Sequence, residues 1–192
     1  MPQVRFIGNE EQRLVKRLQQ GDKTAAREFY ARYADSIAGV CARYIADDED
    51  VKDVFQNTLV QIFSHIADFK YRGSGSLEAW AKKVVVNESL KFLKSKDRHE
   101  LLQEDCDFVE EVEEEEVPPI SDISSDTIRQ LLSQLPTGYR TVLNLYVFEG
   151  KSHQEIANML GIKKDSSASQ LHKAKKMLAK LISKYNDNHP RR

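Results

Sequence analysis

The chain has 192 residues, of which 40% are hydrophobic and 31% charged, and its formal net charge at pH 7 is -1. This composition is typical of a soluble globular protein with one large or two small domains, and the short apolar runs exclude a membrane-spanning segment. The N-terminus lacks the features of a secretory signal, so we expect a cytoplasmic protein without stable membrane insertion.

The N-terminal part predicts a domain of four helices and no strand, because apolar residues recur there at helical spacing. The expected helices run from about Leu14 to Gly21, from Asp22 to Tyr44, from Asp47 to Ile66, and from the end of the loop Phe69–Ser76 to Phe92. Trp80, on the fourth helix, is expected to pack in the core.

An acidic segment separates this part from the rest of the chain. From Glu104 to Glu116 there are nine acidic residues and no basic one, and Pro118 and Pro119 follow soon after. Such a segment repels itself and extends, which predicts a flexible acidic linker at 98–124 between domains at 1–97 and 125–192. One hypothesis is that the acidic run mimics nucleic acid and shields a basic face of the free protein.

The C-terminal part predicts a helix that ends at Pro136, a second that contains Tyr139 to Tyr146, and a helix-turn-helix between Gly150 and Lys176. Ser152 and Glu155 have the spacing of a capping box at the start of its first helix. Gly161 can adopt the left-handed backbone conformation that ends this helix.

The second helix of the motif has the character of a recognition helix. Asp165 or Ser166 is expected to cap it, with Leu171, Ala174, Leu178 and Leu181 as its buried stripe. The residues expected to point outward are Ser166, Ala168, Ser169, Gln170, His172 and Lys173. The alternative interpretation is a plain helical hairpin in a small bundle.

Local charge supports contact with phosphates in two places. From Lys151 to Arg192 there are ten basic residues against three acidic ones, and a second basic run extends from Lys82 to Arg98. Each run taken alone is also compatible with a solvated helix face.

The sequence gives no indication of catalysis. The five histidines and the isolated Cys41 and Cys106 have no spacing typical of a metal site, a disulfide framework or a nucleophile, and no glycine-rich nucleotide-binding loop is present. We therefore expect a protein that is not an enzyme and has no cofactor, metal or small-molecule substrate.

The chain resembles the extracytoplasmic-function (ECF) class of bacterial RNA polymerase sigma factors, from about Glu10 to Lys184. Four signatures carry the resemblance in family order: Leu14 to Asp22 with Phe29 to Tyr33, Asp53 to Phe63, the loop Phe69 to Leu77 with Trp80 and Val84 to Asn87, and Leu135 to Arg140 with the helix-turn-helix. The resemblance implies core RNA polymerase and promoter DNA as partners, and an anti-sigma factor as a further one.

The resemblance also implies a role for individual residues. The loop and the helix after it would capture a flipped base and separate strands at the minus-ten element, through Tyr71, Arg72, Gly73, Ser74, Lys83, Asn87 and Lys91. The recognition helix would read the minus-thirty-five element through Ser166, Ser169, Gln170, His172 and Lys173. Asp53 and Gln56 would bind polymerase, unless they form only a solvated face.

The sequence departs from the family pattern at two places. Ser166-Ser167-Ala168 stands where many members have Thr-Val and a basic residue, and Lys52 stands where an acidic residue is usual. Three alternatives remain open on the residues alone: an operator-binding regulator, a helical interaction protein, and a loop at Tyr71 that is an ordinary surface turn.

Overall fold

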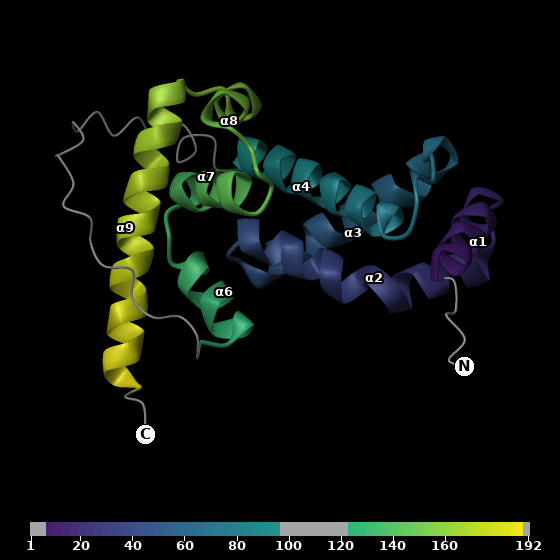
Figure 1. Ribbon diagram of the computed structural model, residues 1–192, viewed down its shortest axis with the longest axis horizontal. Coiled ribbons are helices and arrows are strands. Elements are labelled where there is room, and N and C mark those ends of the chain that lie inside the picture. The colour runs from purple at the N-terminus through teal and green to yellow at the C-terminus, as the bar shows by residue number, and fades with distance from the viewer. Residues whose placement is uncertain (1–6, 97–122, 190–192) are drawn as a thin grey trace, which may run out of the picture. The chain divides into compact units, whose positions relative to one another are not determined.

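The computed structural model describes residues 7–96 and 123–189, and within these ranges it contains eight α-helices, one short 3-10 helix and no strand (Figure 1). The prediction of an all-helical chain is confirmed. No helix in these two ranges is both long enough and apolar enough to cross a membrane. The predicted linker at 98–124 lies outside the described residues except for Ile123 and Ser124, as does the hypothesis of an acidic shield.

The described residues form two compact units. The first contains residues 7–42 and 47–91, and the second contains residues 43–46, 92–96 and 123–189. Two helical units agree with the predicted fold class, and the domain boundaries at 97 and 125 stay a prediction.

The four predicted helices lie in the first unit, except for residues 43–44 and 92–96, which belong to the second. They are α1 (Ile7–Gln19), α2 (Lys23–Tyr44), α3 (Asp48–His65) and α4 (Ser76–Lys96), with a 3-10 turn η1 (Ile66–Asp68) after α3. Asp47 caps α3, since its carboxylate accepts hydrogen bonds at 3.0 Å from the backbone N–H groups of Glu49 and Asp50. The buried core of this unit includes Leu14, Phe29, Ile37, Ile62, Leu77 and Val85.

The second unit is organised around its last helix. It contains α6 (Ser125–Ser133), α7 (Thr137–Val147), α8 (His153–Leu160) and α9 (Lys164–Asn188), and α9 packs against the other three (Figure 1). Arg140 of α7 is only 4% exposed, and its guanidinium donates to the carbonyl oxygens of Ser133 at 3.0 Å and Leu135 at 2.9 Å. A cation thus satisfies carbonyls at the C-terminal end of α6, where the helix dipole favours positive charge.

The helix-turn-helix has the local geometry predicted for it. The Ser152 hydroxyl accepts a hydrogen bond from the Glu155 N–H at 3.3 Å, and the Glu155 carboxylate accepts one from the Ser152 N–H at 2.9 Å. Gly161 has φ of 76°, and its N–H donates to the carbonyl oxygen of Ala157 at 2.8 Å. The capping box and the glycine turn are both confirmed.

Two predictions about the second helix of the motif are wrong. The helix begins at Lys164 after Lys163, which makes no side-chain cap, so Asp165 and Ser166 lie inside the first turn instead of capping it. Gln170 is 4% exposed and does not point outward. The helical repeat places it on the same inner face as Ser167, Leu171 and Ala174, all of them buried. Of the other residues assigned to the buried stripe, Leu178 and Leu181 are half-buried.

The glycine at the turn gives a first testable prediction. A β-carbon at Gly161 would meet no atom within 4 Å, so the cost of Gly161→Ala is the left-handed backbone conformation itself. We expect a loss of about 1 kcal/mol in the free energy of unfolding. Gly39 lies in the interior of α2 with similar open space, and Gly39→Ala should stabilise by about 0.5–1 kcal/mol. Chemical denaturation followed by circular dichroism measures the free energy of unfolding of both variants. Equal changes of the same sign in the two variants would contradict the prediction.

Candidate nucleic-acid interfaces

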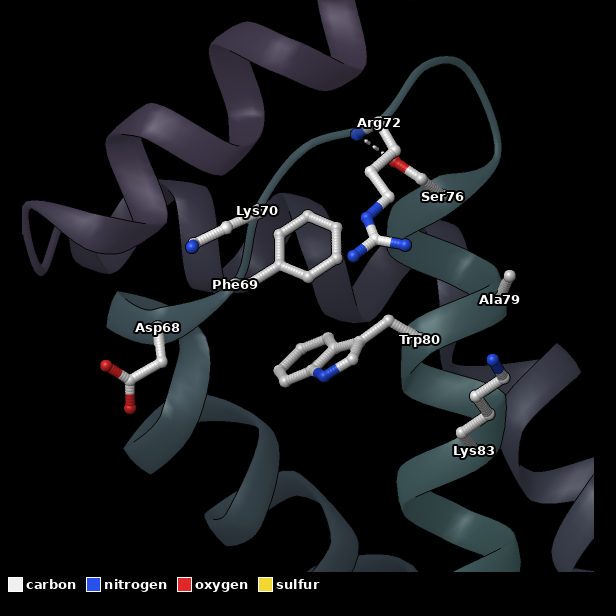
Figure 2. A pocket seen from close by; sticks show the side chains of 8 residues that line it. All are labelled: Asp68, Phe69, Lys70, Arg72, Ser76, Ala79, Trp80 and Lys83. Atoms are coloured by element: carbon white, nitrogen blue, oxygen red, sulfur yellow. Dashed lines mark hydrogen bonds between the residues drawn. The ribbon is translucent and has the colours of Figure 1, made fainter.

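In the first unit, an exposed loop between η1 and α4 holds most of the residues assigned to the minus-ten element. Gly73 and Gly75 have φ of 125° and 83°, conformations that residues with a β-carbon rarely adopt. The Arg72 N–H donates to the Ser76 hydroxyl at 3.2 Å (Figure 2). The Ser76 N–H donates to the Gly73 carbonyl at 3.1 Å. The loop is thus folded back on itself at the start of α4.

A cavity of about 440 Å³ opens beside this loop. It is lined by Asp68, Phe69, Lys70, Arg72, Ser76, Ala79, Trp80 and Lys83 (Figure 2). The rings of Phe69 and Trp80 lie with their centroids 5.0 Å apart and their planes tilted by 40°. Arg72 extends from the loop toward these rings. An aromatic wall beside three cationic side chains offers a stacking surface for a base and contacts for its phosphates.

Trp80 differs from its predicted position. It is half-buried instead of packed in the core, and it lines the cavity at the loop. It lies on the side of α4 that faces Phe69, and the two rings are in contact. Phe69 and Trp80 are therefore candidate site residues that the sequence interpretation missed, and two aromatic residues on either side of a glycine-containing loop were the available signal.

A second cavity, of about 380 Å³, shares Phe69, Trp80 and Asp68 with the first. Its other lining residues are Gln61, His65, Val84, Asn87 and Glu88. The amides of Gln61 and Asn87 can both donate and accept hydrogen bonds, as base edges require. The two cavities thus differ in chemistry: the first has three cationic side chains beside Asp68, whereas the second has two amides and a second carboxylate, that of Glu88.

The exposed face of α4 connects the two cavities. Lys83, Asn87 and Lys91 are exposed and follow one another at intervals of four residues, which places them on one side of the helix. The Lys91 ammonium nitrogen lies 3.8 Å from a carboxylate oxygen of Glu88. Lys82, part of the predicted basic run, is directed elsewhere, because its ammonium pairs with Glu78 at 2.7 Å.

Three predicted loop residues do not line the first cavity among the side chains described. Ser74 is exposed, whereas Tyr71 and Gly73 are half-buried. Burial raises the pKa of the Tyr71 phenol, and the carboxylate of Glu11 adds to this effect. Tyr71 therefore stays a neutral ring at pH 7 on the side of the loop near α1.

A stripe of exposed residues runs along α3. Asp53, Gln56, Val60 and Phe63 follow a spacing of three, four and three residues, so they share one helical face. Val60 and Phe63 are 60% and 36% exposed. The predicted Asp53 and Gln56 thus continue into an apolar surface, which a purely solvated face would not need. Lys52, which stands where the family usually has an acidic residue, forms an ion pair with Glu49, and its ammonium nitrogen lies 2.6 Å from a carboxylate oxygen.

In the second unit, four of the five residues assigned to the minus-thirty-five element are accessible. Ser166, Ser169, His172 and Lys173 of α9 are half-buried, and Ala168 between them is exposed. Gln170 is on the buried face, so a base contact from its side chain is not supported. Lys163 and Lys164 are exposed at the start of α9, the end of a recognition helix that enters the groove, and the sequence interpretation missed them.

The polar Ser167, one of the departures from the family pattern, has a partner in the turn. It is fully buried, and its hydroxyl lies 3.0 Å from Nδ1 of His153 at the start of α8. The His153 ring stacks on Tyr146 of α7, with centroids 4.9 Å apart. A hydrogen bond between α8 and α9 thus replaces the apolar contact expected at this position.

Within residues 7–96 and 123–189, no group of three or more histidine, cysteine or acidic residues is arranged to hold a metal ion. Cys41 is buried, and burial raises the pKa of its thiol to about 11, so it is a poor nucleophile at neutral pH.

Comparison with known proteins identifies both units. The family model of Sigma-70 region 2 matches residues 29–99, and that of Sigma-70 region 4 matches residues 125–178. RNA polymerase sigma-H factor of Pseudomonas aeruginosa is 27% identical over 183 residues, covering 90% of this chain and 94% of that protein. ECF RNA polymerase sigma-E factor of Haemophilus influenzae is 28% identical, covering 90% and 95%. A solved structure of CnrH in complex with the cytosolic domain of CnrY covers 88% of this chain and 95% of its own, with 21% identity and a TM-score of 0.46.

Two matched regions in family order, on two helical units, define the class of protein as a factor that directs RNA polymerase to promoters. The chain belongs to the extracytoplasmic-function class of sigma factors. The resemblance drawn from the sequence is confirmed, and the operator-binding regulator and the helical interaction protein are set aside.

Proposed function

We propose that this sigma factor opens promoter DNA by capturing an unstacked base in the cavity beside Phe69 and Trp80. The observation that carries the proposal is the pair of aromatic rings at the wall of a cavity that also holds Arg72 and Lys83. Stacking of a base on an aromatic ring contributes about 1–3 kcal/mol, which offsets much of the cost of removing that base from the duplex.

The charged and amide side chains around the cavity fit the neighbouring DNA. Arg72 and Lys83 would contact the phosphates of the opened strand, and Lys91 would contact the backbone further along α4. Asn87 would donate to and accept from a base edge beside the captured base. Ser74 and Gly73 would supply close backbone approach at the loop, and Tyr71 would support its inner side.

The second unit would place α9 in the major groove of the minus-thirty-five element. Ser166, Ser169, His172 and Lys173 remain the proposed contacts, and Lys163 and Lys164 join them as phosphate contacts. Gln170 is withdrawn from the set because its side chain is buried.

The stripe on α3 would dock on core RNA polymerase. Asp53 and Gln56 supply polar contacts, while Val60 and Phe63 supply apolar area, the combination typical of protein interfaces. The polymerase would carry out all the chemistry in the cytoplasm, and this subunit would contribute binding energy only. An anti-sigma factor, expected from the family, would hold the free protein inactive.

Reconstituted transcription tests the proposal. The protein is mixed with bacterial core RNA polymerase and genomic fragments, run-off transcripts identify a promoter, and permanganate then detects unpaired thymines in its minus-ten region. We expect transcripts and permanganate reactivity only when both components are present. Binding to core without strand opening would refute the role of the cavity, whereas failure to bind core would refute the docking surface.

A further inference from the structure

Two side chains of helix α1 contact the loop between η1 and α4 (residues 69–75), one near each of its ends. Glu11 and Gln19 lie eight residues apart on this helix, and Leu14, Val15 and Leu18 between them are buried in the core. The helix is therefore a fixed support, and its two polar side chains reach the loop from the same side.

Glu11 holds the end of the loop. Glu11 is only 2% exposed. Its carboxylate accepts hydrogen bonds from the Gly75 N–H at 2.6 Å and from the Leu77 N–H at 2.8 Å. Gly75 directly precedes α4 and Leu77 lies in its first turn, where N–H groups have no partner within the helix. An ionised carboxylate satisfies two of them and interacts favourably with the helix dipole. Glu11 thus fixes the point from which Trp80 and Lys83 project.

Gln19 holds the beginning of the loop. Its side-chain amide donates to the carbonyl oxygens of Ile66 at 3.2 Å and Phe69 at 2.9 Å. The second of these bonds is made to the backbone of the residue whose ring forms one wall of the cavity. Gln19 therefore fixes the position of Phe69 as Glu11 fixes that of Trp80.

The loop between these two points needs such support. Gly73 and Gly75 can each adopt many backbone conformations, and a loop that contains both would otherwise sample several shapes. Within the loop, the Arg72 N–H donates to the Ser76 hydroxyl and the Ser76 N–H donates to the Gly73 carbonyl, and both bonds span only a few residues at its C-terminal end. A cavity that must select one base requires a fixed distance between its two aromatic walls.

We propose that Glu11 and Gln19 are positioning residues for promoter opening: they set the separation of Phe69 and Trp80 and thereby the choice of captured base. The inference rests on the proposed function of the cavity. The side chain of Glu11 is buried under the loop, so it acts through the backbone of Gly75 and Leu77 and does not touch DNA.

Two substitutions test the proposal, each with a matched neighbour. In Glu11→Gln the new side chain keeps one acceptor oxygen and turns an NH₂ group toward the other N–H, which loses a charged hydrogen bond. Gln19→Ala removes the hydrogen bonds to the carbonyls of Ile66 and Phe69. It leaves no cavity in the core, because the Gln19 side chain is exposed. Glu10→Gln and Gln20→Ala make the same chemical changes at exposed positions one residue away.

The first readout needs no polymerase. Trp80 is the single tryptophan of the chain, so its emission and its quenching by acrylamide report the cavity wall directly. We expect stronger quenching and a red-shifted emission in Glu11→Gln and Gln19→Ala, with helix content and both matched controls at wild-type values. Trp80 emission equal to that of the controls in both variants would overturn the proposal.

The second readout is base discrimination in the reconstituted holoenzyme. The yield of open complex is compared between a promoter and a copy with the captured base substituted. We expect this ratio to fall about tenfold in Glu11→Gln and about threefold in Gln19→Ala, at unchanged core affinity. Unchanged ratios would overturn the proposal. If the wild type itself opens no promoter, the function of the cavity fails, and Trp80 emission still decides whether α1 positions its wall. If Glu11→Gln fails to fold, Gln19→Ala decides alone.

Discussion

Promoter opening by the holoenzyme is expected to fall about 5- to 150-fold when Trp80 is replaced by alanine, because stacking of a base on an aromatic ring contributes about 1–3 kcal/mol. The substitution removes one wall of the cavity and leaves Phe69 as the only ring beside Arg72 and Lys83. The fluorescence of a 2-aminopurine placed in the minus-ten region measures the change. Affinity for core polymerase should stay within about twofold, since Trp80 is not on the α3 stripe.

Three variants separate loss of stacking from loss of structure. Trp80→Phe keeps an aromatic face and should retain most of the opening, whereas Phe69→Ala should reduce opening in the same way as Trp80→Ala. Tyr185→Ala removes a half-buried ring near the end of α9 and should open promoters normally. Normal opening by Trp80→Ala, with thermal unfolding near that of the wild type, would show that the cavity does not capture the base.

Charge reversal at Asp53 is expected to weaken binding to core polymerase about tenfold or more. Asp53 is exposed at one end of the α3 stripe, so the substitution Asp53→Lys should change the free energy of unfolding by no more than about 0.5 kcal/mol. If Asp53 faces a basic surface of the polymerase, the lysine adds repulsion between like charges to the loss of the original attraction. The free energy of binding then falls by more than removal of the aspartate alone would cause. Fluorescence anisotropy of labelled protein titrated with core enzyme measures the affinity.

The matched control for this substitution is Asp187→Lys, which reverses a charge that is also exposed, in the last turns of α9. Its affinity for core should equal that of the wild type. The defect of Asp53→Lys should shrink as salt is raised, because exposed charges are screened. Val60→Asp tests the apolar part of the stripe and should weaken binding at every salt concentration. Equal affinities for Asp53→Lys and Asp187→Lys would rule out docking through this end of α3.

The family and the fold were predictable because they depend on local patterns. The capping box of Ser152 and Glu155 and the left-handed Gly161 need only residues a few positions apart, so the sequence contains all the information that their geometry requires. The same holds for the periodic apolar residues that predict each helix. Asp53 and Gln56 were found on the exposed face of α3 for the same reason.

Other predictions failed where polarity or size was taken as a guide to burial. The polar Gln170 is expected on the outer face, but the helical repeat aligns it with Ser167 and Ala174 on the inner one. The large aromatic Trp80 is expected in the core, but it lies half-buried against Phe69. The phase of a helix relative to its neighbours decides both cases, and residue type alone does not determine that phase.

The sequence alone therefore determined the class of protein, its helices and the position of the loop for which we propose base capture. Tertiary structure alone decided what forms the cavity and what holds it. Glu11 lies 64 and 66 residues before the amides that it accepts from, and Gln19 lies 47 and 50 residues before the carbonyls to which it donates. In the sequence both look like ordinary polar residues on an amphipathic helix. Only packing of α1 against the turn and the start of α4 brings these partners within hydrogen-bond distance.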